Sequence, residues 1–309
     1  MSTSRFTRSG RPALRGVIPA LFLLAACSAG APERPVGEVI AEADAGKAEA
    51  VPVLIGYFGH PDGDTVQMAW EAAVRLGGTA EGALVAALDS PDRTVSEHAA
   101  GALGAIRSED AVEALEKALE KPDFRRYVAA WALGEIGNPG AVPALVEALG
   151  DEDGETRKYA ARALVKFGPE GVPALIEALG SPSPWRRRYA VRALGEIRDP
   201  RAAGPLLGME GEVDREVFLW ALGRIGDPRG YSVIAAAAED PDWRIRLAAV
   251  QALGDLANKE AVPALTGALG DEEWIIREWA ARGLESVTGD RLTYRDQKGE
   301  DVYPYNLYR

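Results

Sequence analysis

The sequence predicts an all-α fold, a right-handed α-solenoid of about eight helix pairs followed by a short non-helical tail. The main evidence is an arginine that recurs six residues before an Ala-Leu or Gly-Leu pair. With two looser earlier copies, the leucines of these pairs lie 27 to 31 residues apart. Repeats of this length stack, and each buries its apolar face only against its neighbours. The 309 residues are therefore expected to form one elongated body instead of several compact domains. The recurrent arginines are Arg126, Arg157, Arg187, Arg215, Arg246 and Arg277.

The first 26 residues predict a signal peptide, because four arginines precede an apolar run at 17–26 that is too short to span a bilayer. The run ends in Leu24-Ala25-Ala26-Cys27, and Cys27 is the chain's single cysteine. This arrangement resembles the lipobox of bacterial lipoproteins, which implies lipidation of Cys27 after cleavage. An ordinary secretory cleavage site is the alternative. Because Ser28 stands where an aspartate would favour the inner membrane, the resemblance implies an outer-membrane lipoprotein of the cell envelope that faces the periplasm.

Charge limits the classes of partner. Removing residues 1–26 removes four arginines and no acids, so the formal charge changes from -12 to -16. Such an acidic protein disfavours nucleic acid and anionic lipid headgroups as partners. We therefore expect no nucleic acid partner, and membrane contact through the N-terminal lipid anchor only.

Residues 27–50 are small, acidic and Pro-containing, which predicts a flexible tether with a short helix near Val39. The solenoid is expected over 51–287, and residues 141–168 show its plan most clearly. A first helix carries an apolar stripe that includes Val142, Leu145 and Val146; an acidic turn follows, and a second helix ends at Gly168. In a later unit, glycines and a proline at 204–211 interrupt the first helix, which predicts a change of curvature there.

These units resemble HEAT repeats of the short type found in the phycobilisome-lyase-like HEAT family. In that family an aspartate in the turn and an arginine six residues later form a ladder between repeats. Asp151, Asp240 and Asp271 stand at that distance before Arg157, Arg246 and Arg277, whereas Ser181 and Met209 depart from the pattern. The resemblance implies that all six recurrent arginines are structural, each partly buried against turn carboxylates and carbonyls.

The sequence predicts no catalytic residues, no metal site and no cofactor. Its two histidines, His60 and His98, lie in different units and cannot build the two-iron site of the HEAT-like deoxyhypusine hydroxylases. Acidic turns such as 151–155 and 271–273 are expected to cap helices, because the spacing of a calcium loop is missing. The resemblance leaves three alternatives: a bilin lyase-like enzyme, a hydroxylase-like oxidoreductase, or an accessory subunit of an envelope complex.

Register instead indicates a binding groove. In HEAT repeats the second helix lines the concave face, and the residue before each Ala-Leu pair points away from the core. These outward positions hold tryptophans and arginines in a row, and such a row attracts a protein or peptide partner, best an acidic one. The predicted function is therefore non-catalytic binding or scaffolding. The alternative is that the tryptophans pack on adjacent repeats while the arginines reach Glu135 and Glu196. The groove candidates are Trp131, Arg162, Arg192 and Trp220, with Tyr127 and Arg188 one turn away.

The tail, residues 288–309, is polar and rich in tyrosine. Leu292-Thr293-Tyr294 and Val302-Tyr303 flank a turn that contains Gly299, which predicts a small hairpin or an extended strap. Its expected role is to cover the exposed face of the last repeat. The alternative is a partner-binding tail that presents Tyr303, Tyr305 and Tyr308.

Overall fold

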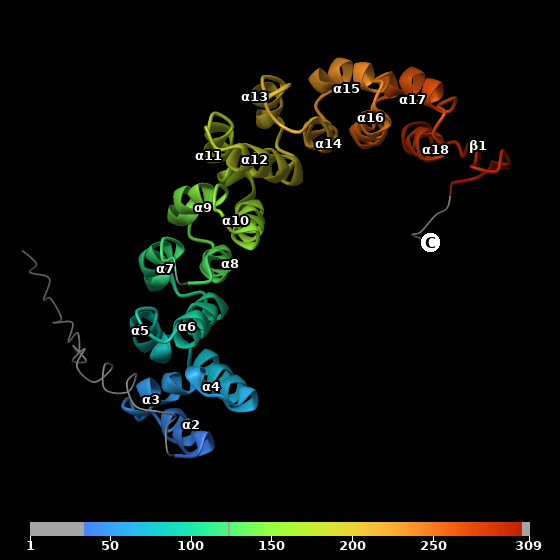
Figure 1. Cartoon of the computed structure of the whole chain (residues 1–309). Helices are drawn as coiled ribbons and strands as arrows, with labels where there is room; N and C mark the ends of the chain where they lie inside the picture. The colour runs from blue at the N-terminus through green and yellow to red at the C-terminus, as the bar shows by residue number, and fades with distance from the viewer. Residues whose placement is uncertain (1–33, 123, 305–309) are drawn as a thin grey trace, which may run out of the picture.

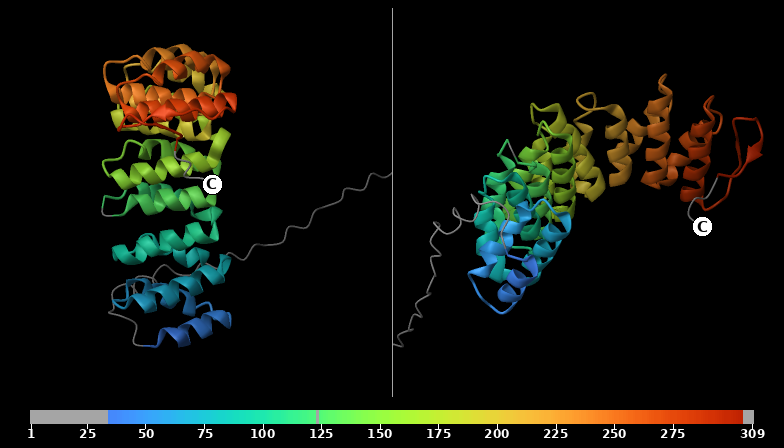
Figure 2. Two further views of the ribbon diagram at one scale, coloured as in Figure 1. Left: turned by 90° about the vertical axis from the view of Figure 1, so that its right-hand side faces the viewer. Right: turned by 60° about the horizontal axis from the view of Figure 1, so that its bottom comes forward.

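The computed structural model describes residues 34–304 except residue 123, and these residues form an arc of stacked helices (Figure 1). The helices lie across the long axis of the stack, layer upon layer (Figure 2). Each inner helix packs against the inner helices of the neighbouring layers. The predicted all-α solenoid is confirmed, with eight helix pairs within the described residues.

In each pair the first helix lies on the outer side of the arc and the second on the inner side (Figure 1). The outer helices are α3 (Ala50–Gly56), α5 (Gly78–Ala87), α7 (Val112–Leu119), α9 (Val142–Ala148), α11 (Val172–Ala178), α13 (Ala203–Leu207), α15 (Tyr231–Ala237) and α17 (Val262–Ala268). The inner helices are α4 (Gly63–Leu76), α6 (Arg93–Ile106), α8 (Arg126–Ile136), α10 (Gly154–Phe167), α12 (Pro184–Ile197), α14 (Arg215–Ile225), α16 (Trp243–Leu256) and α18 (Trp274–Thr288).

The turns between outer and inner helices supply a side-chain cap for five of the eight inner helices within the described residues. Asp153 accepts hydrogen bonds from the amides of Glu155 and Thr156, at 3.3 and 2.9 Å. Ser183 accepts one from the amide of Arg186 at 3.3 Å. A side-chain oxygen here satisfies an amide that has no partner inside the helix, and so fixes where the helix begins. The same cap is formed by Asp62, Asp92 and Asp242.

The inner helices approach one another closely, because a glycine follows the repeat leucine in most of them. A Cβ atom added at Gly223 would lie 2.6 Å from the Cα atom of Ala252 on the next inner helix. A Cβ added at Gly134 would meet the Cβ and Cα atoms of Ala163 at 2.6 and 2.9 Å. These contacts leave no room for a side chain, so glycine allows the spacing of the layers.

The unit predicted to be interrupted is irregular. Its outer helix, α13, has only five residues, and Gly211 in the following turn has a φ of +85°. The stack rises from α3 to α10 in Figure 1 and runs sideways from α14 to α18.

The short helix predicted near Val39 is present, and it packs against the solenoid. Helix α2 (Val36–Asp44) lies within the segment expected to be a tether, and it packs on α3 and α4. Val39 and Ala43 are buried in this contact, which covers the first repeat. The tether predicted for 27–50 therefore does not extend to residue 50, because the apolar face of the amphipathic helix α2 packs against the first repeat.

The hairpin predicted in the tail is present. Strands β1 (Tyr294–Arg295) and β2 (Asp301–Val302) pair antiparallel, with Tyr294 opposite Val302. Tyr294 is buried against the last layer, and burial raises the pKa of its phenol. Arg277 of α18 donates to the carbonyls of Arg295 and Asp296, at 2.7 and 3.2 Å. The hairpin thus contacts the last inner helix, as expected of a cap.

Candidate binding surface on the inner helices

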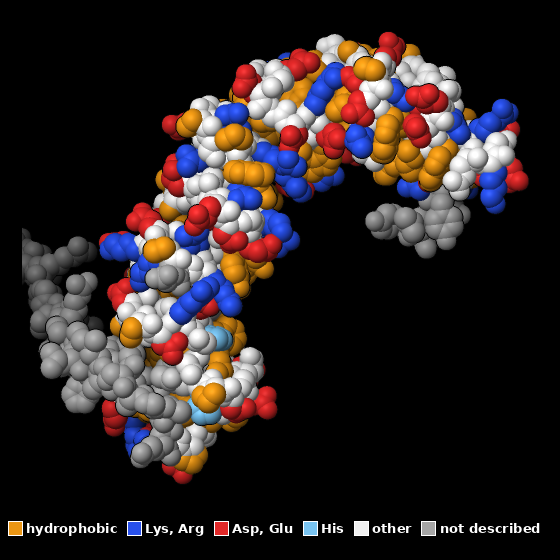
Figure 3. All heavy atoms as spheres, viewed as in Figure 1, with side chains coloured by type: hydrophobic (Ala, Val, Ile, Leu, Met, Phe, Trp, Pro, Cys, Tyr) orange, Lys and Arg blue, Asp and Glu red, His pale blue; other side chains and the backbone are white. Residues whose placement is uncertain are grey.

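The residues predicted to form a groove lie on consecutive inner helices, α8 to α14. Arg162 and Arg192 are exposed, whereas Trp131 and Trp220 are half-buried. Tyr127 stacks against Tyr159 of the next helix, with ring centroids 5.3 Å apart. Figure 3 shows basic side chains along the inner edge of the arc beside α10 and α12.

Three surface cavities follow these helices, and each joins a tryptophan to an arginine. The first, about 250 Å³, includes Trp131 and Arg162. The second, about 420 Å³, lies where α12 meets the loop before α14 and includes Trp185 and Arg188. The third, about 360 Å³, is lined by Arg192, Glu216, Val217, Trp220, Trp243, Arg244, Leu247, Ala248 and Gln251. The predicted residues therefore line pockets on successive layers of the arc.

Part of the packing alternative also holds. A Cβ atom added at Gly104 or Gly195 would lie 2.9 or 2.6 Å from the indole of Trp131 or Trp220, so both rings lie against the preceding helix. Glu135 and Glu196 do bind basic side chains, but these are Lys166 and Arg224. Within the described part of the chain, no carboxylate pairs with Arg162 or Arg192. Arg188 differs, because it pairs with Asp214.

Sequence reasoning missed the second tryptophan and arginine of the third pocket. Trp243 and Arg244 open helix α16, and Trp243 keeps 40% of its surface exposed. The sequence prediction selected only the residue before each Ala-Leu pair. It did not include the first turn of each inner helix. The adjacent tryptophan and arginine directly after the helix-capping Asp242 were the available signal, since these two residue types are enriched where proteins bind one another.

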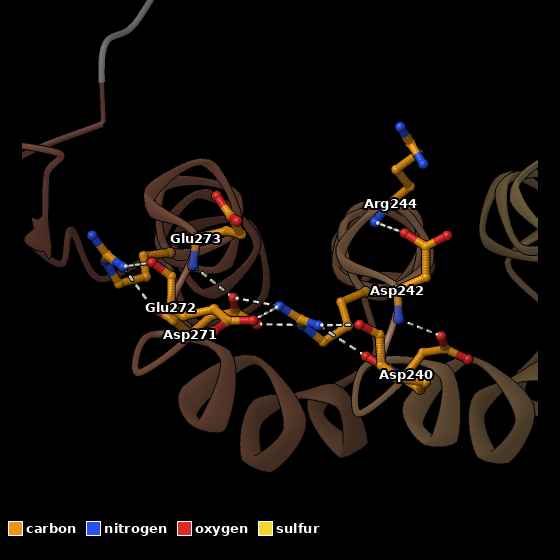
Figure 4. A network of polar contacts seen from close by, with 9 residues as sticks. Asp240, Asp242, Arg244, Asp271, Glu272 and Glu273 are labelled. Carbon is orange, nitrogen blue, oxygen red and sulfur yellow. Dashed lines mark hydrogen bonds and ion pairs between the residues drawn. The ribbon is translucent and has the colours of Figure 1, made fainter.

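The recurrent arginines form a ladder at the other end of the inner helices, beside the turns. Figure 4 shows one part of it, in which the network runs from Asp240 on one turn to Asp271 and Glu272 on the next, while Arg244 points away. The guanidinium of Arg246 lies between these turns. Its Nη1 donates to the backbone carbonyl of Asp240 at 2.9 Å, and its Nε and Nη2 donate to the Asp271 carboxylate at 2.8 and 3.1 Å.

The carboxylate partner is therefore not the one predicted. Four of the arginines bind the carbonyl, not the side chain, of the residue six positions earlier, as Arg157 does with Asp151 at 2.6 Å; the other three are Arg187, Arg246 and Arg277. The carboxylate comes from the next turn, 25 residues later, as in Arg126 with Asp151 at 2.8 Å. Arg215 binds Asp240 in the same sense. An arginine side chain is long enough to bridge two turns, so one residue joins two repeats.

Burial and charge oppose each other at these pairs. The carboxylate of Asp271 raises the pKa of Arg246, although burial lowers it. Burial raises the pKa of Asp271. Hydrogen bonds from Arg246 and from the Glu273 amide lower this pKa by more than burial raises it, so the net shift is downward. Both groups are therefore held in their charged forms at neutral pH.

Two turns between repeats have no carboxylate at the ladder position. Ser181 and Met209 occupy the turn positions that would receive Arg157 and Arg187, and no carboxylate of the described residues pairs with either guanidinium. Arg157 instead lies over the rings of Trp185 and Tyr189, 4.4 and 5.7 Å from their centroids. The Nε atoms of Arg157 and Arg187 are buried without a hydrogen-bond partner.

In the part of the chain that the structure describes, no three His, Cys, Asp or Glu side chains gather closely enough to hold a metal ion. No helix among those same residues has the length and apolar character needed to span a membrane. The segment predicted to be a signal peptide, residues 1–26, and the predicted lipidation site Cys27 lie outside the described residues, as do Tyr305 and Tyr308 of the tail.

Comparison with solved structures finds similar helical repeat proteins. The complex of CpcE and CpcF of phycocyanin lyase from Nostoc sp. PCC7120 is 30% identical over 57% of this chain and 76% of that chain, with a TM-score of 0.42. Human deoxyhypusine hydroxylase in complex with glycerol is 21% identical over 81% of this chain and 100% of that chain, with a TM-score of 0.35. Kap121p is 14% identical over 86% of this chain and 33% of its own length, with a TM-score of 0.54, which is a likeness of fold alone.

No curated protein matches the sequence. The family described as HEAT repeats matches four overlapping stretches, residues 78–133, 125–172, 151–217 and 210–285. Together these stretches cover more than half of the chain and follow the helix pairs of the arc. The chain belongs to the HEAT-repeat family.

Proposed function

We propose that this HEAT-repeat chain is a non-catalytic scaffold that binds a protein or peptide along its inner helices. The observation that supports this most is the set of three pockets, each of which pairs a tryptophan with an arginine. Tryptophan and arginine are the residues on which protein interfaces most often depend. The arc repeats this pairing from one layer to the next, so an extended segment could contact several pockets at once.

The third pocket offers the sharpest test, because its arginines are exposed. Arg192 and Arg244 make no ion pair with the described residues, so reversing their charge leaves the core intact. Peptides would be selected from a random display library on the full chain. Their affinities would then be measured for the wild type and for Arg192→Glu with Arg244→Glu. We expect a loss of about tenfold or more, which corresponds to about 1.4 kcal/mol.

The matched control is Lys259→Glu with Lys298→Glu, which makes the same change of charge at two exposed sites outside the pockets. It should bind the selected peptides as the wild type does. The proposal fails if no peptide is selected, or if the selected peptides bind both double variants equally well.

We further propose that Cys27 anchors the scaffold by a lipid in the bacterial cell envelope, at the outer membrane facing the periplasm. The support is the apolar run that ends at a single cysteine after four arginines. Expressed in a bacterium that processes lipoproteins, the wild type should incorporate labelled palmitate and pellet with membranes. Cys27→Ser should lose both properties. Labelling of the Cys27→Ser variant would contradict the anchor.

A further inference from the structure

Positive charge on the inner side of the arc is concentrated in two adjacent helices. Helices α10 and α12 each contain four basic residues and one acidic residue, in a chain whose formal charge is -12. In every other inner helix, the basic residues outnumber the acidic ones by one at most. This basic region, α10 with α12, coincides with the two turns that have no carboxylate at the ladder position.

The intact ladder shows what is missing there. Arg126 and Arg246 both use Nε and Nη2 to hold an aspartate of the next turn in a bidentate pair, at 2.8 to 3.1 Å. At Arg157 the Nη1 contacts to its own turn are retained, at 2.6 and 2.9 Å. Its Nε, which elsewhere binds the aspartate, is buried and has no partner. A buried donor without a partner is costly, so a carboxylate bonded to it would be stabilising.

The turn at 180–183 keeps the shape of the intact turns. The Oγ of Ser181 accepts a hydrogen bond from the Ser183 amide at 3.2 Å, just as Asp151 accepts one from the Asp153 amide at 2.7 Å. Serine therefore preserves the turn while removing the carboxylate. Ser181 also lines a surface cavity of about 650 Å³ between α9 and α11.

A third guanidinium reaches the same turn. Arg186 lines this cavity with Ser181, and it forms an ion pair with Glu147 across it. The Nε atom of Arg186, like those of Arg157 and Arg187, is buried without a hydrogen-bond partner. Arg157, Arg186 and Arg187 thus share a single carboxylate among the described residues, that of Glu147.

We propose that an acidic segment of another protein binds across α10 and α12, and that one of its carboxylates binds Arg157 where an aspartate binds in the intact ladder. This rests on the proposed function and names the chemistry of the partner. Trp185 covers the face of the Arg157 guanidinium and is 49% exposed. A carboxylate binds the edge of a guanidinium, so stacking on the indole and bidentate pairing are compatible.

A protein segment fits this region better than a nucleic acid or an anionic membrane. The basic region covers two helices only, and the neighbouring turns at 151–155 and 210–214 are acidic. A longer polyanion would meet these acids and be repelled, whereas a short run of carboxylates would remain within the basic region.

Repair of the ladder provides the test. Ser181→Asp supplies the missing carboxylate from the chain itself, so it competes with the proposed ligand for Arg157. The probe is a fluorescently labelled peptide of alternating Glu and Ala, titrated with the full chain and followed by anisotropy. We expect Ser181→Asp to weaken binding by about tenfold or more, the effect of one charge-assisted pair. We also expect it to raise the melting temperature, because a buried guanidinium gains its partner.

Ser183→Asp is the matched control, since it adds the same charge to the same turn and an aspartate caps a helix as well as a serine does. It should change the affinity for the probe by less than Ser181→Asp does. Arg157→Gln is the second variant, should Ser181→Asp fold poorly. It should lower the affinity for the probe to a similar extent.

A melting temperature that rises in Ser181→Asp while the probe binds unchanged would overturn the inference. So would a single-stranded oligonucleotide or an anionic phospholipid vesicle that binds the basic region more tightly than the peptide does. If the probe fails to bind while display-selected peptides still depend on Arg192 and Arg244, the acidic segment is refuted and the scaffold function stands. If the binding of those peptides does not depend on Arg192 and Arg244 either, the proposed function is refuted as well.

Discussion

Replacing Asp271 by alanine is expected to lower the free energy of unfolding by about 3–5 kcal/mol. Asp271 and Arg246 are both at least nine-tenths buried, and two hydrogen bonds join them. Removing the carboxylate leaves the buried guanidinium with only the exposed, solvent-screened carboxylate of Glu272, and the loss of a buried partner costs far more than the pair contributes as a unit. Urea unfolding of the wild type and of Asp271→Ala, followed by circular dichroism, measures the difference.

Glu272 supplies the control for this prediction. Its carboxylate also binds Arg246, at 3.0 Å, but the side chain is 79% exposed. Solvent screens such a contact, so Glu272→Ala should cost no more than about 1 kcal/mol. Equal losses in the two variants would show that the effect comes from the turn and not from burial of the pair.

The same pair fixes the sign of one contribution to the pH dependence. Because the pKa of Asp271 is lower in the folded chain than its ordinary value of about 4, folding favours the charged form. The stabilisation is fully present above the ordinary pKa and is lost as pH falls through the folded value. Stability should therefore decline less steeply with acid in Asp271→Ala than in the wild type.

The sequence was sufficient to predict how the helix pairs stack, but not which aspartate pairs with which arginine. The recurrent arginine gave the repeat length, and the helix pairs follow it. Each ladder aspartate, however, lies six residues before one arginine and 25 residues after the previous one. The two pairings fit one spacing equally well, and only the direction of the side chain separates them. Ser181 looked like a departure from the pattern, yet its backbone carbonyl binds Arg187 at 2.8 Å as the aspartates' carbonyls bind theirs.

The candidate surface was predictable in part for a related reason. One residue per inner helix could be placed by counting from the arginine, and the structure shows Arg162 and Arg192 exposed there. Counting did not reveal that Trp131 and Trp220 lie on glycines of the preceding helix. That contact depends on how closely two helices approach, which the repeat length does not specify.

A single methyl group at Gly223 is expected to destabilise the fold by about 1–3 kcal/mol or more. Its Cβ would lie 2.6 Å from the Cα and 2.8 Å from the carbonyl oxygen of Ala252. These are backbone atoms of α16, so a side chain cannot turn aside to make room, and α14 and α16 must separate. Because the layers share one continuous core, the shift also loosens the contacts on either side. The melting temperature of Gly223→Ala measures this cost.

Gly267→Ala makes the same chemical change with the opposite expected sign. Gly267 is an exposed residue of α17, and a Cβ atom there meets nothing within 4 Å. Alanine should therefore raise the free energy of unfolding by about 0.5–1 kcal/mol, since it lowers the conformational entropy of the unfolded chain. Loss of stability in both variants would mean that glycine is needed for helix geometry in general. Opposite signs would show that the close approach of the inner helices, and not helix propensity, requires a glycine after the repeat leucine.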